Sequence, residues 1–466
     1  MRNLPFFKLN FWIILLIAAQ VAAIIFLCLY IPSLINLAAA LLLVWLLSAI
    51  SSVILFARKG CPEIKLVWMV FIAALPVAGA LVYLIASVPR KPCGVLTVTD
   101  GGRDGLSAAA GGLCGTCAAG FASASYFSTG SEFWSAAQTS IKNAKKSVYI
   151  EFFIISAGHL MNTVMQSLEQ AKQNGAEIRI IFDGVGSAFR LSRRDIKRLK
   201  TLGEVRTFHR LTPFPHAKIN VRDHRKIIVV DGKTVYTGGV NLADEYVNLT
   251  SPHGFWKDTG VALHGSVAKI FEGMFLSVWN GAYEMPAPEL QQGETPCLPY
   301  YDSPYARSFC EDLFVNAIHS AKERVCVLTP YFCVSDKAAA ALTFAARRGV
   351  DVRIIIPHVP DKKYAFAVSK AFAASIAPGG VRFYEYSPGF MHAKCLICDD
   401  RAFMGSYNFD FRSFHFNYEC GVMLSGRVCD EILNDFNECA ALSAQIKPAK
   451  RKGVLGFLLR FFAPLI

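Results

Sequence analysis

Two copies of the pattern His-x-Lys-x4-Asp contain the residue types that chemistry on a phosphodiester requires. The first copy consists of His224, Lys226 and Asp231, and the second of His392, Lys394 and Asp399. The four residues before each aspartate are apolar, which predicts a buried β-strand, and residues two apart in a strand face the same side. We therefore expect the imidazole and ammonium groups of each copy to converge, and the two aspartates to be structural partners of the motif more than proton carriers.

A segment rich in small residues follows each copy and predicts an anion cradle. Gly238–Asn241 reads Gly-Gly-Val-Asn, and Gly405–Asn408 reads Gly-Ser-Tyr-Asn. Small residues let a phosphate approach the backbone, and the amides of Asn241 and Asn408 can donate hydrogen bonds to it. A hydroxyl contribution is expected from Ser406 in the second copy alone.

A third match to the spacing is interpreted as a decoy. It consists of His216, Lys218 and Asp223. Polar Asn220 and Arg222 interrupt its apolar spacer, and no Gly-Gly-x-Asn segment lies at the matching distance. The two complete copies occupy equivalent places in a repeat, which disfavours the reading of their histidines as ordinary core or surface residues.

The elements that must position these residues occur twice in the same order. The strand pattern Val148–Ile155 corresponds to Val325–Phe332, and Gly175–Phe182, after an amphipathic helix, corresponds to Gly349–Ile356. Strands that alternate with helices predict an α/β fold of two similar lobes, with mixed sheets flanked by helices. Because pockets favour domain interfaces, we expect one site between the lobes.

The region before residue 90 predicts a membrane anchor. It holds three apolar runs: Phe11–Ile31, Leu34–Phe56 and Leu66–Val88. Two or three crossings are expected, and a cleaved signal peptide is disfavoured because the first run is too long and others follow it. Basic residues on both sides of the third run leave open whether it crosses or lies at the surface. The predicted division of the chain is 1–91 for the anchor, 92–125 for a flexible linker, 126–295 and 296–446 for the lobes, and 447–466 for a basic, amphipathic segment.

The net charge of +13 suits either nucleic acid or an anionic membrane surface. Near the C-terminus, four basic residues precede the apolar segment Val454–Phe462: Lys447, Lys450, Arg451 and Lys452. Such a segment suits an anionic membrane surface. Docking of the same helix on the protein's own core is the equal alternative.

No pattern for a metal or a nucleotide cofactor is apparent, so no cofactor is expected. The C-x-x-C pairs Cys114/Cys117 and Cys395/Cys398 each lack the second ligand pair of a structural zinc site. The fourteen cysteines lie among apolar neighbours, which is typical of reduced core residues. Neither an acidic metal cluster nor a G-x-x-x-x-G-K-[ST] loop is present in the sequence. Covalent catalysis by histidine remains.

Several longer segments around the motifs carry a family resemblance. They are Pro62–Trp68, Gly238–Tyr246, Phe255–Thr259, Thr329–Phe332, Tyr384–Phe390 and Asn417–Cys420. With the two motifs, they resemble the phospholipase D superfamily and, within it, bacterial cardiolipin synthases, over nearly the whole chain. The resemblance implies that Asp258 and Glu419 provide the carboxylates that orient the catalytic histidines. Gly239 stands where the wider superfamily usually has Ser, and in this it is similar to the first motif of cardiolipin synthases.

The resemblance implies a phosphatidyltransferase of the bacterial cell (inner) membrane with several membrane crossings. Such an enzyme moves a phosphatidyl group from one phosphatidylglycerol to another, giving cardiolipin and glycerol. Membrane phospholipids are the expected partners, and nucleic acid is not. One histidine would attack phosphorus to form a phosphatidyl-histidine while the other acts as acid and base. We hypothesise His224 as the nucleophile and His392 as the acid/base.

Three other functions remain open from the residues alone. A hydrolytic phospholipase D would use the same chemistry with water as the acceptor. A nuclease would also use it, although the apolar segments argue against this class. A non-catalytic lipid-binding membrane protein is the most remote alternative, because both motifs are complete.

Overall fold

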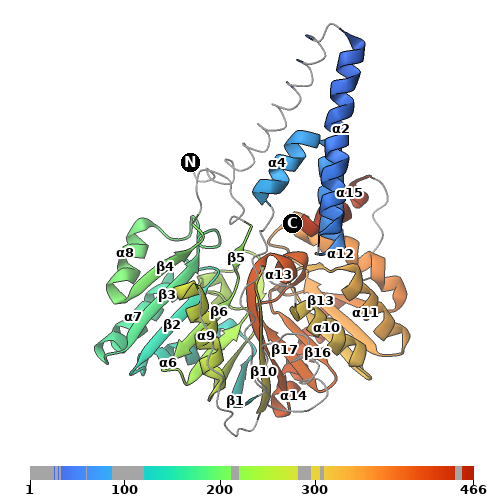
Figure 1. Ribbon diagram of the computed structural model, residues 1–466. Helices are drawn as coiled ribbons and strands as arrows, with labels where there is room; N and C mark the ends of the chain where they lie inside the picture. Colours follow the sequence, from blue (N-terminus) through green and yellow to red (C-terminus); the bar gives the residue numbers. More distant parts are fainter. Residues whose placement is uncertain are drawn as a thin grey trace.

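The computed structural model describes residues 33–58, 60–86, 120–210, 220–281, 295–304, 309–446 and 454–465, together with residues 22, 26 and 30. Two α/β lobes lie side by side in this part of the chain, and the long helix α2 (Leu34–Ala57) rises from one end of them (Figure 1). This arrangement confirms the predicted fold class of two similar lobes with mixed sheets flanked by helices.

The first lobe is built on a mixed sheet of seven strands. They are β1 (Gly120–Phe127), β2 (Ser147–Phe152), β3 (Glu177–Asp183), β4 (Glu204–Phe208), β6 (Lys226–Val230), β7 (Thr234–Gly238) and β9 (Gly260–His264), in the spatial order β1-β9-β7-β6-β2-β3-β4. The helices are α6 (Gly130–Lys142), α7 (His159–Gln173), α8 (Arg193–Leu202), α9 (Val267–Asn280) and the short η2 (Asp244–Val247). α7 forms and packs because Leu160, Val164 and Leu168 recur at helical spacing, and all three are buried.

The second lobe repeats this order and adds one edge strand. Its strands are β10 (Thr295–Asp302), β11 (Arg324–Leu328), β13 (Asp351–Pro357), β14 (Arg382–Tyr386), β16 (Cys395–Cys398), β17 (Arg401–Gly405), β19 (Asn417–Ser425) and β20 (Ser443–Ile446), in the order β10-β19-β17-β16-β11-β13-β14-β20. The helices are α10 (Phe309–Ser320), α11 (Asp336–Arg347), α12 (Lys363–Ile376), α13 (Phe411–His415), α14 (Arg427–Ala441) and the short η3 (Ala377–Gly379).

The two sheets are joined into one, because β1 and β10 pair antiparallel with Gly120 opposite Cys297. β1 begins inside the segment predicted as a linker, so the linker prediction for residues 120–125 is wrong. Five of the eight residues of β1 are Gly, Ala or Ser, and the strand forms with β9 and β10 as hydrogen-bonding partners on its two sides. Residues 92–119 lie outside the described part of the chain.

The apolar spacers of the two motifs form the buried central strands β6 and β16, as predicted. Cys395 and Cys398 begin and end β16 and are buried, free cysteines. Cys114 and Cys117 lie outside the described residues. Because β6 and β16 hold equivalent places in the two sheets, the residues just before them meet at the same end of the molecule.

Asp231 and Asp399 end the motif strands in the left-handed conformation, with φ of 55° and 53°. The Asp399 carboxylate accepts backbone N–H bonds of 2.8, 2.9 and 3.0 Å from residues 322–324, and Asp231 accepts equivalent bonds from residues 145–147. Burial raises the pKa of each carboxyl, but the backbone donors outweigh it and lower the pKa overall. Seven residues of extended chain separate each aspartate from its histidine by about 20 Å. The aspartates therefore hold a turn and lie outside the reach of proton transfer.

The anchor differs from the prediction. The run Leu66–Val88 is broken into α3 (Pro62–Ala74) and α4 (Pro76–Ala86), because Pro76 lacks the N–H that would continue the helix through Leu75. Within the described residues, Ile35–Ala57 is the one helix long and apolar enough to cross a membrane. The run Phe11–Ile31 lies almost wholly outside those residues, so the structure does not support the predicted several crossings.

The C-terminal helix α15 (Val454–Phe462) and the turn η4 (Ala463–Leu465) dock on the second lobe. Leu459 and Ala463 join an apolar cluster with Phe411 of α13 and Ile64 of α3. The basic residues at 447–452 lie outside the described part of the chain. α3 is attached next to this cluster, where Glu63 accepts a 2.9 Å hydrogen bond from the backbone N–H of Asp336.

The turn contacts of Asp399 predict a stability defect without a direct catalytic one. Asp399→Ala removes three charge-assisted acceptor bonds and leaves a non-glycine residue at positive φ, so we expect the free energy of unfolding to fall by about 2 kcal/mol. Thermal unfolding of the purified variant measures this loss. Asp400→Ala, at the exposed neighbouring position, is the matched control. Equal unfolding midpoints for the two variants would contradict the assignment.

Candidate active site

Each motif histidine lies in a short link between two strands and is held there by the other lobe. His224 lies between β5 (Arg222–Asp223) and β6, and β5 pairs with β19 of the second lobe. His392 lies between β15 (Gly389–Met391) and β16, and β15 pairs with β8 (Phe255–Lys257) of the first lobe. The backbone N–H of His224 donates to Tyr418 O at 3.0 Å, and that of His392 donates to Lys257 O at 2.7 Å. The main chain thus fixes both histidines across the lobe boundary.

The side-chain contacts cross the same boundary. Nδ1 of His224 donates to both carboxylate oxygens of Glu419, at 2.9 and 3.0 Å. Nδ1 of His392 donates to Asp258 at 2.5 Å. The two carboxylates implied by the family resemblance therefore serve the histidine of the opposite lobe. This bond leaves Nε2 of each ring as the nitrogen with a lone pair.

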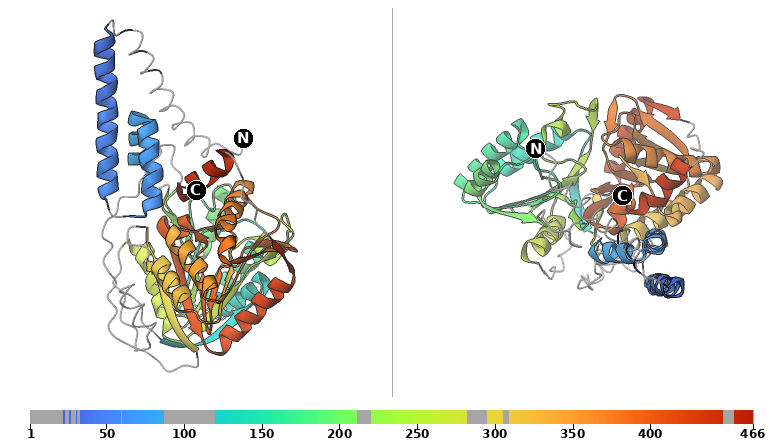
Figure 2. Two further views of the ribbon diagram at one scale, coloured as in Figure 1. Left: turned by 90° about the vertical axis from the view of Figure 1, so that its right-hand side faces the viewer. Right: turned by 90° about the horizontal axis from the view of Figure 1, so that it is seen from above.

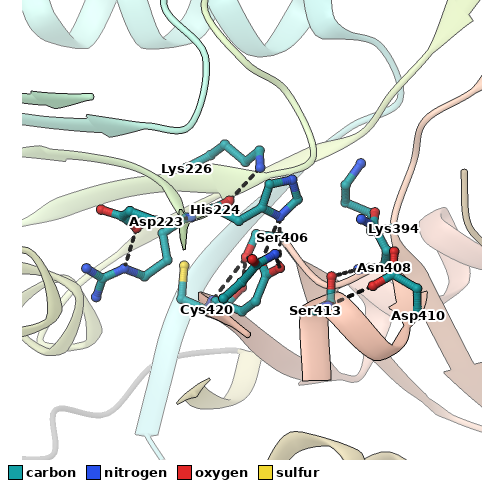
Figure 3. A network of polar contacts seen from close by, with 12 residues as sticks. Asp223, His224, Lys226, Lys394, Ser406, Asn408, Asp410, Ser413 and Cys420 are labelled. Atoms are coloured by element: carbon teal, nitrogen blue, oxygen red, sulfur yellow. Dashed lines mark hydrogen bonds and ion pairs between the residues drawn. The ribbon is translucent and has the colours of Figure 1, made fainter. Parts of the chain in front are cut away.

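The two histidines belong to one buried cluster. Burial lowers the pKa of His224 to about 4, against the opposing effect of Glu419. Burial also lowers the pKa of His392, and Lys394, Lys226 and His224 lower it further. Both imidazoles are neutral at pH 7. Figure 3 shows Lys226 of the first lobe and Lys394 of the second near the His224 ring.

The motif lysines supply buried positive charge to this cluster. Nζ of Lys226 donates to His224 O, and Nζ of Lys394 donates to His392 O, both at 2.5 Å. Burial lowers the pKa of Lys226 to about 7 and that of Lys394 to about 8, and the nearby carboxylates oppose both shifts. When they are protonated, these two lysines can neutralise the charge of a bound phosphate anion.

The two carboxylates differ in charge state. Burial raises the pKa of Asp258 to about 7. Burial acts on Glu419 as well, but His224 and the hydroxyl of Ser406 are among the groups that outweigh it, and the pKa is lowered overall. Glu419 is therefore a full negative charge behind His224, while Asp258 titrates near neutrality behind His392.

Ser406 and Gly239 occupy equivalent places and explain the difference between the two motifs. The Ser406 hydroxyl donates to Glu419 and accepts the N–H of Cys420, so it orients the carboxylate and does not contribute the hydroxyl expected for phosphate. A Cβ added at Gly239 would meet Asp258 Oδ1 at 2.0 Å. Asp258 thus occupies the space that a serine side chain at position 239 would need. In the other motif, the serine Ser406 is present and bonds to Glu419.

The two asparagines of the predicted cradle have different surroundings. Asn241 is bonded within its own lobe: Oδ1 accepts from Ile154 N at 3.1 Å and Nδ2 donates to Tyr246 OH at 2.8 Å. These bonds give Asn241 a structural role, but they occupy only one of its two Nδ2 hydrogens, so its donation to phosphate stays a prediction. Asn408 is 6% exposed, and its Oδ1 has no hydrogen-bond partner among the described residues. This Oδ1 atom is therefore available to accept a hydrogen bond from a ligand.

Sequence reasoning missed a buried charge network beside His224. Arg225 is 1% exposed, donates to Glu151 at 2.5 Å and to Asp223 at 3.1 Å, and lies over the ring of Tyr418 at 5.3 Å. It thereby supports the residue whose carbonyl holds His224. Asp223 belonged to the decoy motif, whose His216 and Lys218 lie outside the described residues. The sequence does contain a sign of this network: charged Asp223 and Arg225 flank His224 just before an apolar strand.

A second network supports His392. Lys257 donates to Asp435 of α14 at 2.6 Å, and Tyr126 donates to the other oxygen of Asp435 at 2.6 Å. The rings of Tyr246 and Trp256 lie 5.1 and 5.2 Å from that of His392. Asp435 thus holds Lys257, whose carbonyl accepts the N–H of His392. Tyr246 and Trp256 cover the His392 imidazole.

Comparison with known proteins agrees with this geometry. Residues 138–275 and 314–440 match the family model described as "Cardiolipin synthase, PLD-like domain". Cardiolipin synthase A of Pseudomonas syringae is 34% identical over 330 residues, which cover 68% of this chain and 69% of that protein. The cardiolipin synthase of Alkalihalophilus pseudofirmus is 33% identical over 308 residues, but the match covers only 61% of its length.

Two further relatives extend the comparison. An uncharacterised protein of Streptococcus mutans is 36% identical over 73% of this chain and 78% of its own length. The crystal structure of phosphatidylserine synthase from Haemophilus influenzae superposes with a TM-score of 0.57 at 12% identity, over 73% of this chain and 93% of that one, which shows a shared fold. With two matched halves, paired motifs and crossed histidine–carboxylate contacts, the chain belongs to the cardiolipin synthase family of phospholipase D-like phosphatidyltransferases.

Proposed function

We propose that this protein is a cardiolipin synthase that transfers a phosphatidyl group from one phosphatidylglycerol to another. The observation that carries the proposal is the pair of crossed contacts, His224 with Glu419 and His392 with Asp258, which bring two activated imidazoles into one cluster. A double displacement at phosphorus needs two such groups, one to attack and one to move protons.

The donor phosphodiester binds where its negative charge is neutralised. Lys226 and Lys394 supply the charge, and the Nδ2 group of Asn408 donates a hydrogen bond to a phosphate oxygen. Neutralisation must precede attack, because the anion otherwise repels an oxygen or nitrogen nucleophile.

His224 attacks phosphorus in the first step. Its Nε2 has no hydrogen-bond partner among the described residues, while Nε2 of His392 lies 3.2 Å from Lys394 Nζ. The bond from His224 Nε2 to phosphorus forms as the phosphorus–oxygen bond to glycerol breaks, and His392 donates its proton to the leaving oxygen. The bound phosphate anion raises the pKa of the neighbouring imidazole, which allows His392 to carry that proton.

The second step reverses the roles. His392, now neutral, takes the proton from the headgroup hydroxyl of a second phosphatidylglycerol as that oxygen attacks phosphorus. The phosphorus–nitrogen bond to His224 breaks, and cardiolipin leaves. One phosphodiester is exchanged for another, so the reaction needs no external energy source. Both histidines are largely buried, which favours a lipid alcohol over water as the acceptor.

Location in the bacterial cell membrane belongs to the same proposal. The helix Ile35–Ala57 would anchor the lobes beside a bilayer that contains both substrates at high local concentration.

The product decides between transferase and hydrolase. The purified full chain, reconstituted in phosphatidylglycerol vesicles, should give cardiolipin and glycerol in equal amounts by mass spectrometry. Phosphatidate without cardiolipin would identify a hydrolytic phospholipase D, and no turnover of the lipid would reject the proposed function.

Single substitutions test the two-histidine mechanism. His224→Ala and His392→Ala should each lower turnover by about 10³-fold or more, and Glu419→Gln should have a comparable effect through loss of the tautomer-fixing contact. His264→Ala, at the exposed end of strand β9, should remain active. Acid quenching followed by peptide mass spectrometry should place the phosphatidyl adduct on His224. An adduct on His392 would reverse the assignment, and full activity in either alanine variant would reject the mechanism.

The lowered lysine pKa values predict a limit at alkaline pH. Burial lowers the pKa of Lys394 to about 8, so its positive charge is present below that pH and is lost as pH rises through it. We expect kcat/KM to fall as pH rises through about 7 and again through about 8, because Lys226 loses its charge in the first step and Lys394 in the second. Lys394→Arg keeps its charge at these pH values, so the alkaline fall should move upward in whatever activity remains. An unchanged profile in this variant would exclude Lys394 as the titrating group.

A further inference from the structure

Several exposed aromatic side chains lie near the active site, and one other, Phe344, lies away from it. Outside α2, α3 and α4, the described residues with large exposed apolar side chains include Phe189, Phe255, Tyr364 and Phe457. A large patch of exposed apolar side chains is uncommon on the surface of a soluble domain and marks an interaction site. The neighbours of each residue show where it lies.

Two of these residues come from the first lobe. Phe189 is 63% exposed in the loop after β3, where Ser187 donates to Phe153 O at 3.2 Å. The ring of Phe153 lies 4.9 Å from that of His224. Phe255 directly precedes Trp256, which contacts the His392 ring. Both exposed rings therefore lie within a few residues of groups that touch the histidines.

The second lobe contributes Tyr364, which is 51% exposed in the first turn of α12. Lys362 just before α12 is exposed and lies close enough to His392 to lower its pKa, after burial and the nearer charges. Aromatic and basic side chains thus occur together at this edge of the site.

Helix α15 continues the same surface. Its residues Leu459 and Ala463 face the second lobe, while Phe457, Leu458 and Phe462 are exposed beside Arg460. Figure 2 shows this dark red helix at the end of the lobes from which α2 and α4 rise. The basic run at 447–452 precedes it in the sequence. An amphipathic helix with cationic neighbours is typical of attachment to an anionic bilayer surface.

The attachment of the anchor determines the distance from this surface to a membrane. A helix that crosses the bilayer leaves its end at the interface, and α2 ends at Ala57. Only a few residues later, Glu63 bonds to the N-terminus of α11, and Ile64 packs in the cluster that contains α15. A bilayer crossed by α2 therefore lies next to α15 and to the active-site end of the lobes.

We propose that Phe189, Phe255, Tyr364 and the exposed face of α15 form a membrane-contacting rim that inserts into the headgroup region of an anionic phospholipid bilayer around the active site. The rim lets a lipid substrate reach the histidines without leaving the bilayer. The identity of that substrate rests on the proposed function, whereas the membrane contact does not.

Depth-dependent fluorescence tests the contact directly. The full chain is reconstituted in vesicles of phosphatidylglycerol and phosphatidylcholine with brominated acyl chains, as the Phe457→Trp, Phe189→Trp and Phe344→Trp variants and the parent. Phe344 is 54% exposed near the C-terminal end of α11, which leads to the start of β13 away from the site, so it is the matched control. After subtraction of the parent signal, brominated lipid should quench the tryptophan at 457 and at 189 but not at 344.

Equal quenching at all three positions, or none at 457 and 189, would overturn the proposal. Fluorescence shielded from both brominated lipid and aqueous iodide would place a second copy of the chain on this surface and would also overturn it. The quenching does not depend on turnover, so an inactive protein would reject the proposed function and leave this test intact.

A kinetic measurement adds an independent readout. The double variant Phe457→Ser with Phe462→Ser should raise the apparent KM for phosphatidylglycerol in vesicles by about fivefold to tenfold, because less apolar surface inserts. Phe344→Ser should leave KM unchanged. An equal KM for both variants in an active enzyme would contradict the rim.

Discussion

The catalytic cluster exists only when the two lobes are closed on each other, because each lobe holds the carboxylate and the carbonyl that the other lobe's histidine requires. Glu419 and Tyr418 of the second lobe bind His224, and Asp258 and Lys257 of the first bind His392. In an isolated lobe the histidine would lack its orienting carboxylate, and the carboxylate would lose its partner and face water. The pairing of β1 with β10 keeps the lobes in this register by making one continuous sheet.

The two lobes of the internal repeat carry different residues at equivalent positions near the motif histidines. Glu151 and Arg225 form a buried ion pair in the first lobe, whereas the equivalent positions beside the second motif hold Leu328 and Ala393. The acid behind His224 is longer and ionised, and the one behind His392 is shorter and near its titration point. A symmetric fold thus supplies two chemically different imidazoles, as the proposed reaction with one nucleophile and one proton carrier would need.

The buried charge of Lys226 and Lys394 suits the phosphate group of the proposed lipid substrate. In a largely buried cluster, the charge of a protonated lysine would neutralise a lipid phosphate better than it would at an exposed site. Under the proposed function, such a cluster would receive its substrate from the bilayer, because a phospholipid with two acyl chains does not leave it readily. The attachment of α3 to the second lobe through Glu63 places the site next to the bilayer that α2 would cross.

Local pattern was sufficient for the two motifs, their buried strands, the repeat and the α/β lobes, because these depend on residues close together in the chain. The pairing of each histidine was not readable in this way: Glu419 lies 195 residues from His224, and Asp258 lies 134 residues from His392. The resemblance indicated which acids matter, but only the closed lobes decided which histidine each one serves. The same holds for Asn241, whose Oδ1 accepts from Ile154 N and whose Nδ2 donates to Tyr246. Hydrogen-bond partners are set by which atoms lie close together in the folded chain, and the spacing of residues along the sequence does not show this.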